Sequence, residues 1–197
     1  MLKTIFGHAA AAIALSCTSI ALSVTPLAAA SPLGLPRFAT VLMDAGTNEI
    51  LYAEQATAIR HPASITKVMT LYLVFDALES GRLRPDDRVV ISSHAASQRP
   101  SKLGLTPGQS LSVEDAIKVV AVKSANDIAV ALAEKVGGTE QNFARLMTAK
   151  ARQLGMRQTI YANASGLPDP AHFSSAQDIA ILSAAMIRNH PNYYGCF

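Results

Sequence analysis

The sequence has few of the residues that indicate a disulfide framework, a metal centre or a nucleic-acid surface. Its 197 residues include two cysteines and no tryptophan, and 16% are charged. His61, His94, His172 and His190 show neither H-x-x-x-H nor H-E-x-x-H spacing, and no acidic cluster suits calcium. The net charge of +3 comes from scattered basic residues without interleaved aromatics. We therefore predict no metal, no cofactor and no nucleic-acid partner.

Two common enzyme signatures are also absent. The sequence contains no G-x-S-x-G, which argues against a Ser-His-Asp hydrolase, and no glycine-rich phosphate-binding loop. Any nucleophilic chemistry must therefore be sought in a different arrangement.

The N-terminus has the pattern of a secretory signal. A single lysine precedes an apolar stretch over residues 9–24, and Ala28-Ala29-Ala30 supplies the small residues that signal peptidase requires. We expect residues 1–30 to be a signal peptide and residues 31–197 to be one exported domain, in the periplasm or cell envelope. An uncleaved membrane anchor is the alternative, although polar residues interrupt the stretch. After cleavage Cys196 alone remains, so no internal disulfide is expected.

Ser64 and Lys67 form an S-x-x-K pattern at the start of an apolar helical repeat. Side chains three residues apart on a helix lie on one face, within reach of each other. A serine hydroxyl becomes nucleophilic when a neighbouring base takes its proton, and a lysine can do so if burial lowers its pKa. Taken alone the pair is also compatible with a capping serine and an exposed lysine.

A second polar motif, Ser124-Ala125-Asn126, lies between two apolar runs that we expect to be helices. At such a corner both polar side chains can project into a cleft. A hydroxyl can relay a proton, and an amide can bind a peptide group through its carbonyl and its NH2. Ordinary helix capping would explain the same residues.

Taken together, the motifs resemble those of the low-molecular-weight D-alanyl-D-alanine carboxypeptidases, which are penicillin-binding serine peptidases. The resemblance runs from about Phe38 to the last residue. It is carried by four segments in the family's order: Pro62–Thr70, Ser124–Asp127, Leu154–Met156 and Asn163–Pro170. It implies an α+β, β-lactamase/DD-peptidase-like fold, and the removal of the terminal D-alanine from peptidoglycan stem peptides through an acyl-enzyme.

The resemblance also implies a role for each motif residue. Ser64 would be the nucleophile, Lys67 its general base, Ser124 a proton relay to the leaving D-alanine, and Asn126 a substrate-binding residue. The backbone N–H of Ser64 would be one oxyanion donor. β-Lactams would be acylating inhibitors.

The third motif of the family, K-T-G, is absent from all 197 residues, as are its variants H-T-G and K-S-G. We therefore expect an incomplete fold that has an N-terminal hairpin and helices but lacks the C-terminal sheet strands, in an incomplete or inactive chain. The resemblance places peripheral membrane association in a region absent from this sequence. A non-catalytic wall-binding module is the alternative. A class A β-lactamase is disfavoured because Asn163–Pro170 contains no glutamate.

The remaining pattern predicts one hairpin, one short strand, a loop-rich segment and five helices. The hairpin should span Phe38–Tyr52 and the strand Val89–Ile91, with a loop-rich segment over Ala95–Gly108. Capping boxes or capping residues are expected before three of the helices. The expected helices are Ser64–Ser80, Ala116–Lys123, one from Asp127 to Gly137, one from Thr139 to Leu154, and one from Ser175 to the residues before Pro191.

Overall fold

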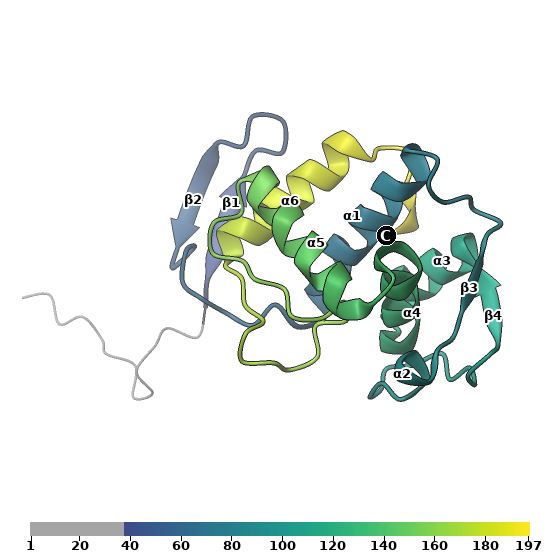
Figure 1. Ribbon diagram of the computed structural model, residues 1–197. Helices are drawn as coiled ribbons and strands as arrows, with labels where there is room; N and C mark the ends of the chain where they lie inside the picture. Colours follow the sequence, from purple (N-terminus) through teal and green to yellow (C-terminus); the bar gives the residue numbers. More distant parts are fainter. Residues whose placement is uncertain (1–37) are drawn as a thin grey trace, which may run out of the picture. The chain divides into compact units, whose positions relative to one another are not determined.

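The structure, a computed structural model, describes residues 38–197 as an α+β domain (Figure 1). The predicted signal peptide lies outside these residues. The strands are β1 (Thr40–Met43), β2 (Ile50–Glu54), β3 (Arg88–Val90) and β4 (Ser110–Ser112). The helices are α1 (Thr66–Glu79), α2 (Ser93–Ala96), α3 (Val113–Lys123), α4 (Asn126–Gly137), α5 (Glu140–Leu154) and α6 (Ala176–Asn189), with 3-10 turns η1 (Ala63–Ile65) and η2 (Tyr194–Cys196).

The predicted hairpin is confirmed as the antiparallel pair β1–β2. Thr40 lies opposite Glu54, and the register shifts between Leu42 and Met43. The turn is closed by Asp44, whose Oδ1 accepts hydrogen bonds from the backbone N–H groups of Gly46 and Thr47 at 2.9 and 2.7 Å. Within residues 38–197 no other strand joins this sheet, and α6 packs against β1.

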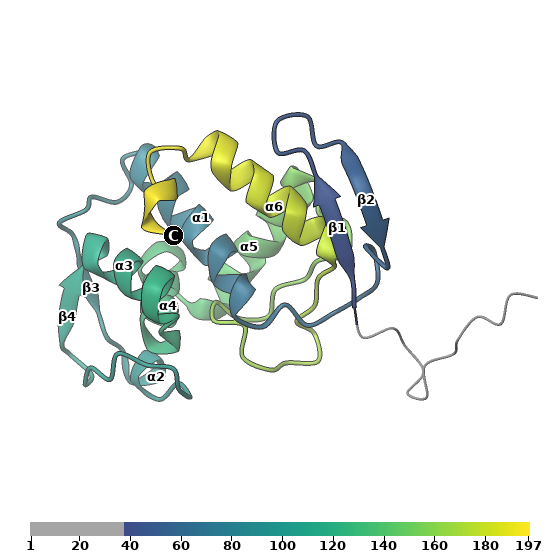
Figure 2. The ribbon, with the colours of Figure 1, turned by 180° about the vertical axis from the view of Figure 1, so that it is seen from behind.

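Helix α1 is the central element of the core. It contacts α3, α4, α5 and α6, and ten of its 14 residues are buried. A helix surrounded in this way is apolar on nearly all sides instead of along a single stripe. Figure 2 shows α1 in the middle of the helices, with α6 and the hairpin to one side and α3 and α4 to the other. The first turn of α1 therefore begins inside the domain, which places Lys67 in a low-dielectric environment.

Three helices begin at side-chain caps that the sequence predicts. The hydroxyls of Ser112, Thr139 and Ser175 accept hydrogen bonds from the backbone N–H of the residue three positions later, at 3.0, 3.1 and 3.2 Å. Each bond satisfies a donor that has no partner within the helix. Helix α5 consequently begins and ends where the sequence indicates.

The structure corrects several predicted boundaries. The first long helix begins at Thr66, because Ser64 lies in the preceding 3-10 turn, where Ala63 has a positive φ of 49°. Helix α3 begins at Val113, three residues earlier than predicted. The loop-rich segment contains the short α2 and is followed by β4, which pairs with β3.

Two further observations concern membranes and metals. Over residues 38–197, none of the helices has the length and apolarity needed to cross a membrane. In the same part of the chain, no three His, Cys, Asp or Glu side chains are grouped so that they could hold a metal ion.

Candidate active site

Ser64 and Lys67 lie side by side at the junction of η1 and α1. Lys67 Nζ is 3.5 Å from Ser64 Oγ, a long hydrogen bond. Ser64 is exposed, whereas the lysine side chain is almost fully buried beneath it. The two side chains that the S-x-x-K spacing predicts to be neighbours are therefore neighbours.

Burial changes the acid–base properties of Lys67. It lowers the pKa of the ammonium group from 10.5 to about 8, because the charged form loses hydration. With this pKa, about a tenth of the lysine is neutral at pH 7, far more than for an exposed lysine. Lys67 can therefore act as a base near neutral pH.

The Lys67 amine is held in place by the loop Asn163–Leu167. Nζ donates to the backbone carbonyl of Ser165 at 2.7 Å. One turn along α1, Thr70 Oγ1 donates to the carbonyl of Ala164 at 2.7 Å. The side chain of Asn163 braces the loop internally, since its Oδ1 accepts the backbone N–H of Gly166 at 2.7 Å. Two successive carbonyls of this loop thus contact the same face of α1.

A buried histidine holds the start of α1. His172 Nε2 and Thr66 Oγ1 are 2.8 Å apart, and the backbone N–H of Ala162 donates to His172 Nδ1 at 3.2 Å. Since Nδ1 accepts a hydrogen bond, the ring proton belongs on Nε2, which donates to Thr66. Burial also lowers the pKa of His172, which favours this neutral ring.

Ser124 and Asn126 occupy the corner between α3 and α4. Ser124 adopts a left-handed conformation with φ of 56°, which ends α3. Asn126 is 5% exposed, and its Nδ2 donates to the carbonyl of Arg99 at 2.8 Å. Its backbone N–H donates to the carbonyl of Ser101 at 2.8 Å. The α3–α4 corner is therefore hydrogen-bonded to the loop around Pro100.

Ser64, Ser124 and Asn126 line a single cavity of about 270 Å³. Lys67 lies beneath it, within reach of Ser64. The cavity therefore brings together all four predicted residues, from elements separated by up to 62 positions in the sequence. Its lining consists of Ser64, Pro100, Ser101, Ser124, Asn126, Ser165, Gly166 and Leu167.

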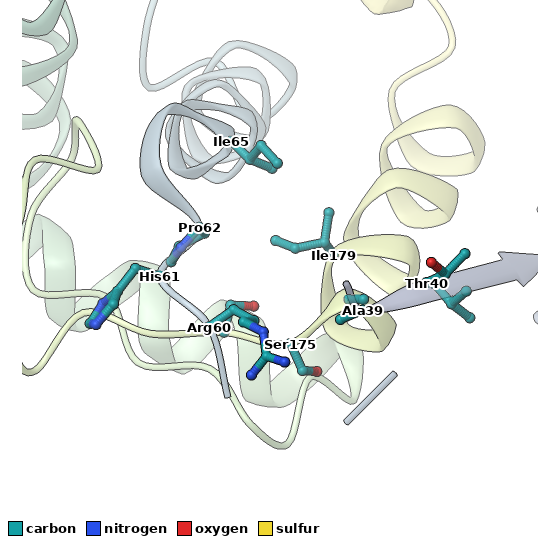
Figure 3. A pocket seen from close by; sticks show the side chains of 11 residues that line it. Ala39, Thr40, Arg60, His61, Pro62, Ile65, Ser175 and Ile179 are labelled. Carbon is teal, nitrogen blue, oxygen red and sulfur yellow. The ribbon is translucent and has the colours of Figure 1, made fainter. Parts of the chain in front are cut away.

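A larger cavity, of about 460 Å³, lies between β1, the start of α6 and the segment before Ser64 (Figure 3). In Figure 3, Ile65 and Ile179 border its apolar part, while Arg60 and Ser175 lie at its other end. It contains none of the four predicted site residues. Its serines, Ser174 and Ser175, are buried, and no lysine lines the cavity that could act as their base, so we assign the chemistry to the smaller cavity.

Sequence reasoning missed several residues of the site. The carbonyl that binds Lys67 comes from Ser165, a residue to which the sequence motifs give no individual role. Ser101 had no sequence signal, because its place in the cavity depends on how a loop folds against the α3–α4 corner. The likeness of Asn163–Pro170 to a family motif was the one available indication that this loop belongs to the site.

Comparison with known proteins agrees with this geometry. The sequence pattern of the D-alanyl-D-alanine carboxypeptidases matches residues 29–196, and the chain belongs to this family. The D-alanyl-D-alanine carboxypeptidase DacF of Bacillus subtilis is 38% identical over 148 residues, which cover 75% of this chain and 38% of the relative.

Solved structures show the same fold. The D-alanyl-D-alanine carboxypeptidase DacD from Francisella tularensis superposes with a TM-score of 0.78 at 39% identity, over 80% of this chain and 38% of that one. Penicillin-binding protein D2 from Listeria monocytogenes, in a cefotaxime-bound form, superposes with a TM-score of 0.69 at 29% identity. The match covers 78% of this chain and 63% of that one. The predicted fold class is thereby confirmed. The chain spans about two fifths of the length of the curated relatives it matches.

Proposed function

We propose that this chain carries the nucleophile and general base of a serine-type D-Ala-D-Ala carboxypeptidase that acts on peptidoglycan stem peptides. The observation that supports this most directly is the 3.5 Å approach of Lys67 Nζ to Ser64 Oγ at the floor of a cavity shared with Ser124 and Asn126. The lowered pKa of Lys67 supports the same assignment, since a base must be partly neutral at the working pH.

The chemistry follows from these groups. Neutral Lys67 takes the Ser64 proton as Oγ bonds to the carbonyl carbon of the penultimate D-alanine. The tetrahedral intermediate then collapses, the C–N bond breaks, and the leaving amine receives a proton through Ser124. An ester on Ser64 and free D-alanine result, and water later hydrolyses the ester.

Two further groups suit the transition state. Ser64 lies in the first turn of η1, where backbone N–H groups lack intrahelical partners and can donate to an oxyanion. The amide NH2 of Asn126 donates to the backbone carbonyl of Arg99. The amide oxygen of Asn126 is therefore left to accept a hydrogen bond from a substrate peptide N–H.

The cavity composition argues against a β-lactamase. None of its lining residues is a carboxylate, so the cavity has no counterpart of the glutamate that a class A β-lactamase uses to activate water against a penicilloyl ester. The acyl-enzyme formed with a β-lactam should therefore persist. The cefotaxime-bound relative supports the view that β-lactams are acylating inhibitors of this chain, and the family supports an exported location in the cell envelope.

The test is covalent labelling by fluorescent penicillin, using protein expressed from the complete reading frame. We expect one adduct on Ser64 by peptide mass spectrometry, no labelling in Ser64→Ala, and labelling reduced at least about 100-fold in Lys67→Ala. Ser183→Ala removes an exposed serine of α6 and should label like the wild type. Undiminished labelling in Ser64→Ala would show that the nucleophile is wrong. A folded wild type that neither labels nor releases D-alanine would favour a non-catalytic wall-binding module.

A further inference from the structure

We propose that Glu140 is a positioning residue for the reaction, because its carboxylate holds the Ala164–Ser165 segment in the place from which the Ser165 carbonyl binds Lys67. The inference rests on the proposed function, in which Lys67 is the general base. Nothing in the sequence motifs indicated a role for Glu140, which is the first residue of α5.

The contacts of Glu140 point toward the site loop and not toward solvent. The residue is 8% exposed, and its Oε1 accepts the backbone N–H of Ala164 at 3.0 Å. Its Oε2 is 2.6 Å from His94 Nε2, on α2. Both carboxylate oxygens are therefore engaged, one by the loop and one by a side chain that fixes the orientation of the carboxylate.

The restrained segment is the one that binds the lysine. The N–H of Ala164 is held by Glu140, its carbonyl accepts from Thr70 Oγ1, and the next carbonyl accepts from Lys67 Nζ at 2.7 Å. Three backbone polar groups of Ala164 and Ser165 are thus fixed by the side chains of Glu140, Thr70 and Lys67. If the first bond is removed, the Ser165 carbonyl loses one of the constraints that set its position.

A charged acceptor suits this position. Hydrogen bonds from backbone N–H groups to a carboxylate are about twice as strong as those between neutral groups. The carboxylate also lies at the N-terminus of α5, where the helix dipole and the unpaired N–H groups favour a negative charge. A carboxylate at position 140 therefore holds the Ala164 N–H more firmly than a neutral acceptor would.

Glu134 provides a matched control within the same structure. Its Oε1 accepts from Ser92 Oγ at 3.0 Å, so it also joins a helix to the α2 region, but it makes no hydrogen bond to Asn163–Leu167 within residues 38–197. A general effect of losing a partly buried carboxylate near α2 should appear in both Glu134→Ala and Glu140→Ala. An effect on Lys67 should appear only in the latter.

The experiment measures the rate of penicillin acylation of Ser64 from pH 6 to 10, together with thermal melting. When the loop loosens, Lys67 gains access to water and its neutral fraction at a given pH falls. For Glu140→Ala we expect the midpoint of the pH–rate curve to move up by about one pH unit, and the rate at pH 7 to fall about tenfold. Near pH 10 the rates should converge. Glu140→Gln, which keeps an acceptor for Ala164, should stay within about threefold of the wild type.

Glu140→Asp keeps the charge at the helix N-terminus but draws the carboxylate back from Ala164, so it should fold and show a smaller shift in the same direction. If Glu140→Ala fails to fold, the pH–rate midpoint of Glu140→Asp is the deciding measurement. Unchanged midpoints in Glu140→Ala and Glu140→Asp, with lower melting temperatures alone, would show a purely structural role and overturn the proposal. If the wild type labels on Ser64 in the same assay, such a result rejects only the role of Glu140 and leaves the proposed function intact.

Discussion

The α-carbon of Gly166 lies directly against the backbone carbonyl of Ala63, one residue before the candidate nucleophile. A Cβ at position 166 would be 1.8 Å from Ala63 O and 2.8 Å from Thr66 Oγ1. Gly166 also has a φ of 82°, in the left-handed region. Two segments about 100 residues apart in sequence can meet here only because one of them has no side chain.

Gly166→Ala should therefore displace η1 from the loop. We expect the melting temperature to fall by roughly 2–12 °C, from overpacking and backbone strain of about 1–3 kcal/mol in total, and penicillin labelling of Ser64 to be largely lost. Gly155→Ala is the control, since Gly155 has a φ of 90° but nothing within 4 Å of a Cβ. Equal losses of labelling in both variants would mean that the close contact with Ala63 is irrelevant.

The second prediction concerns pH. Only neutral Lys67 can take the Ser64 proton, and its pKa is about 8. Below this pH the lysine is protonated, so the acylation rate should fall about tenfold for each pH unit. Above about 8 it should reach a plateau. A stopped-flow pH profile that is flat between pH 6 and 9 would exclude Lys67 as the base.

The lowered pKa of Lys67 also predicts how the stability of the fold depends on pH. Between pH 8 and 10.5 the unfolded chain keeps a proton on this lysine that the folded chain has lost, so the free energy of unfolding should rise with pH in this window. Lys67→Met removes the titrating amine, so its free energy of unfolding should not show this rise with pH. Urea denaturation of the wild type and of Lys67→Met at several pH values isolates the contribution of Lys67, because the two proteins share all other titrating groups.

The third prediction concerns Asp127, which follows the cavity residue Asn126 in the sequence. Asp127 is fully buried at the start of α4, and its carboxylate accepts the backbone N–H groups of Leu103, Gly104 and Ile128 at 3.0, 2.9 and 2.9 Å. Asp127→Ala would leave these donors unpaired in the interior. We expect a loss of about 3 kcal/mol in the free energy of unfolding. Asp86→Ala, which breaks an exposed ion pair, should cost less than about 0.5 kcal/mol.

Much of the fold could be predicted because its signals are local. A capping hydroxyl such as that of Thr139 and a turn residue such as Asp44 act on backbone groups within a few positions. The spacing of Ser64 and Lys67 is likewise a property of one helical turn. Such features depend little on the rest of the chain, so the sequence pattern is sufficient to find them.

What could not be predicted depends on contacts between distant segments. The helix begins at Thr66 and not Ser64, because the approach of Gly166 and the bond to His172 shape the preceding turn. The hydrogen bond from Lys67 to Ser165 spans 98 positions, and that from Ala164 to Glu140 spans 24. No periodicity in the sequence encodes which backbone carbonyl meets which side chain.

The fourth prediction concerns export. The sequence predicts cleavage after Ala30, which lies outside the described residues. N-terminal sequencing or intact-mass analysis of protein recovered from the cell envelope should find Ser31 as the first residue. Recovery of envelope protein that still carries the apolar stretch of residues 9–24 would instead support an uncleaved anchor.

The last prediction concerns recognition of the substrate carboxylate. A peptide that ends in D-Ala-D-Ala carries a negative charge, yet the cavity formed within residues 38–197 is lined by no lysine or arginine. The K-T-G motif whose lysine would bind that carboxylate is absent from the sequence. The K-T-G strand would also supply a second oxyanion donor, and loss of one such donor typically costs about 10²–10³ in turnover.

Purified residues 31–197 should therefore release D-alanine from diacetyl-Lys-D-Ala-D-Ala at least about 100-fold more slowly than the Bacillus subtilis relative assayed in parallel. Circular dichroism confirms that the protein is folded, and Ser64→Ala sets the background. Release at a rate close to that of the relative would show that these residues contain everything that the reaction needs.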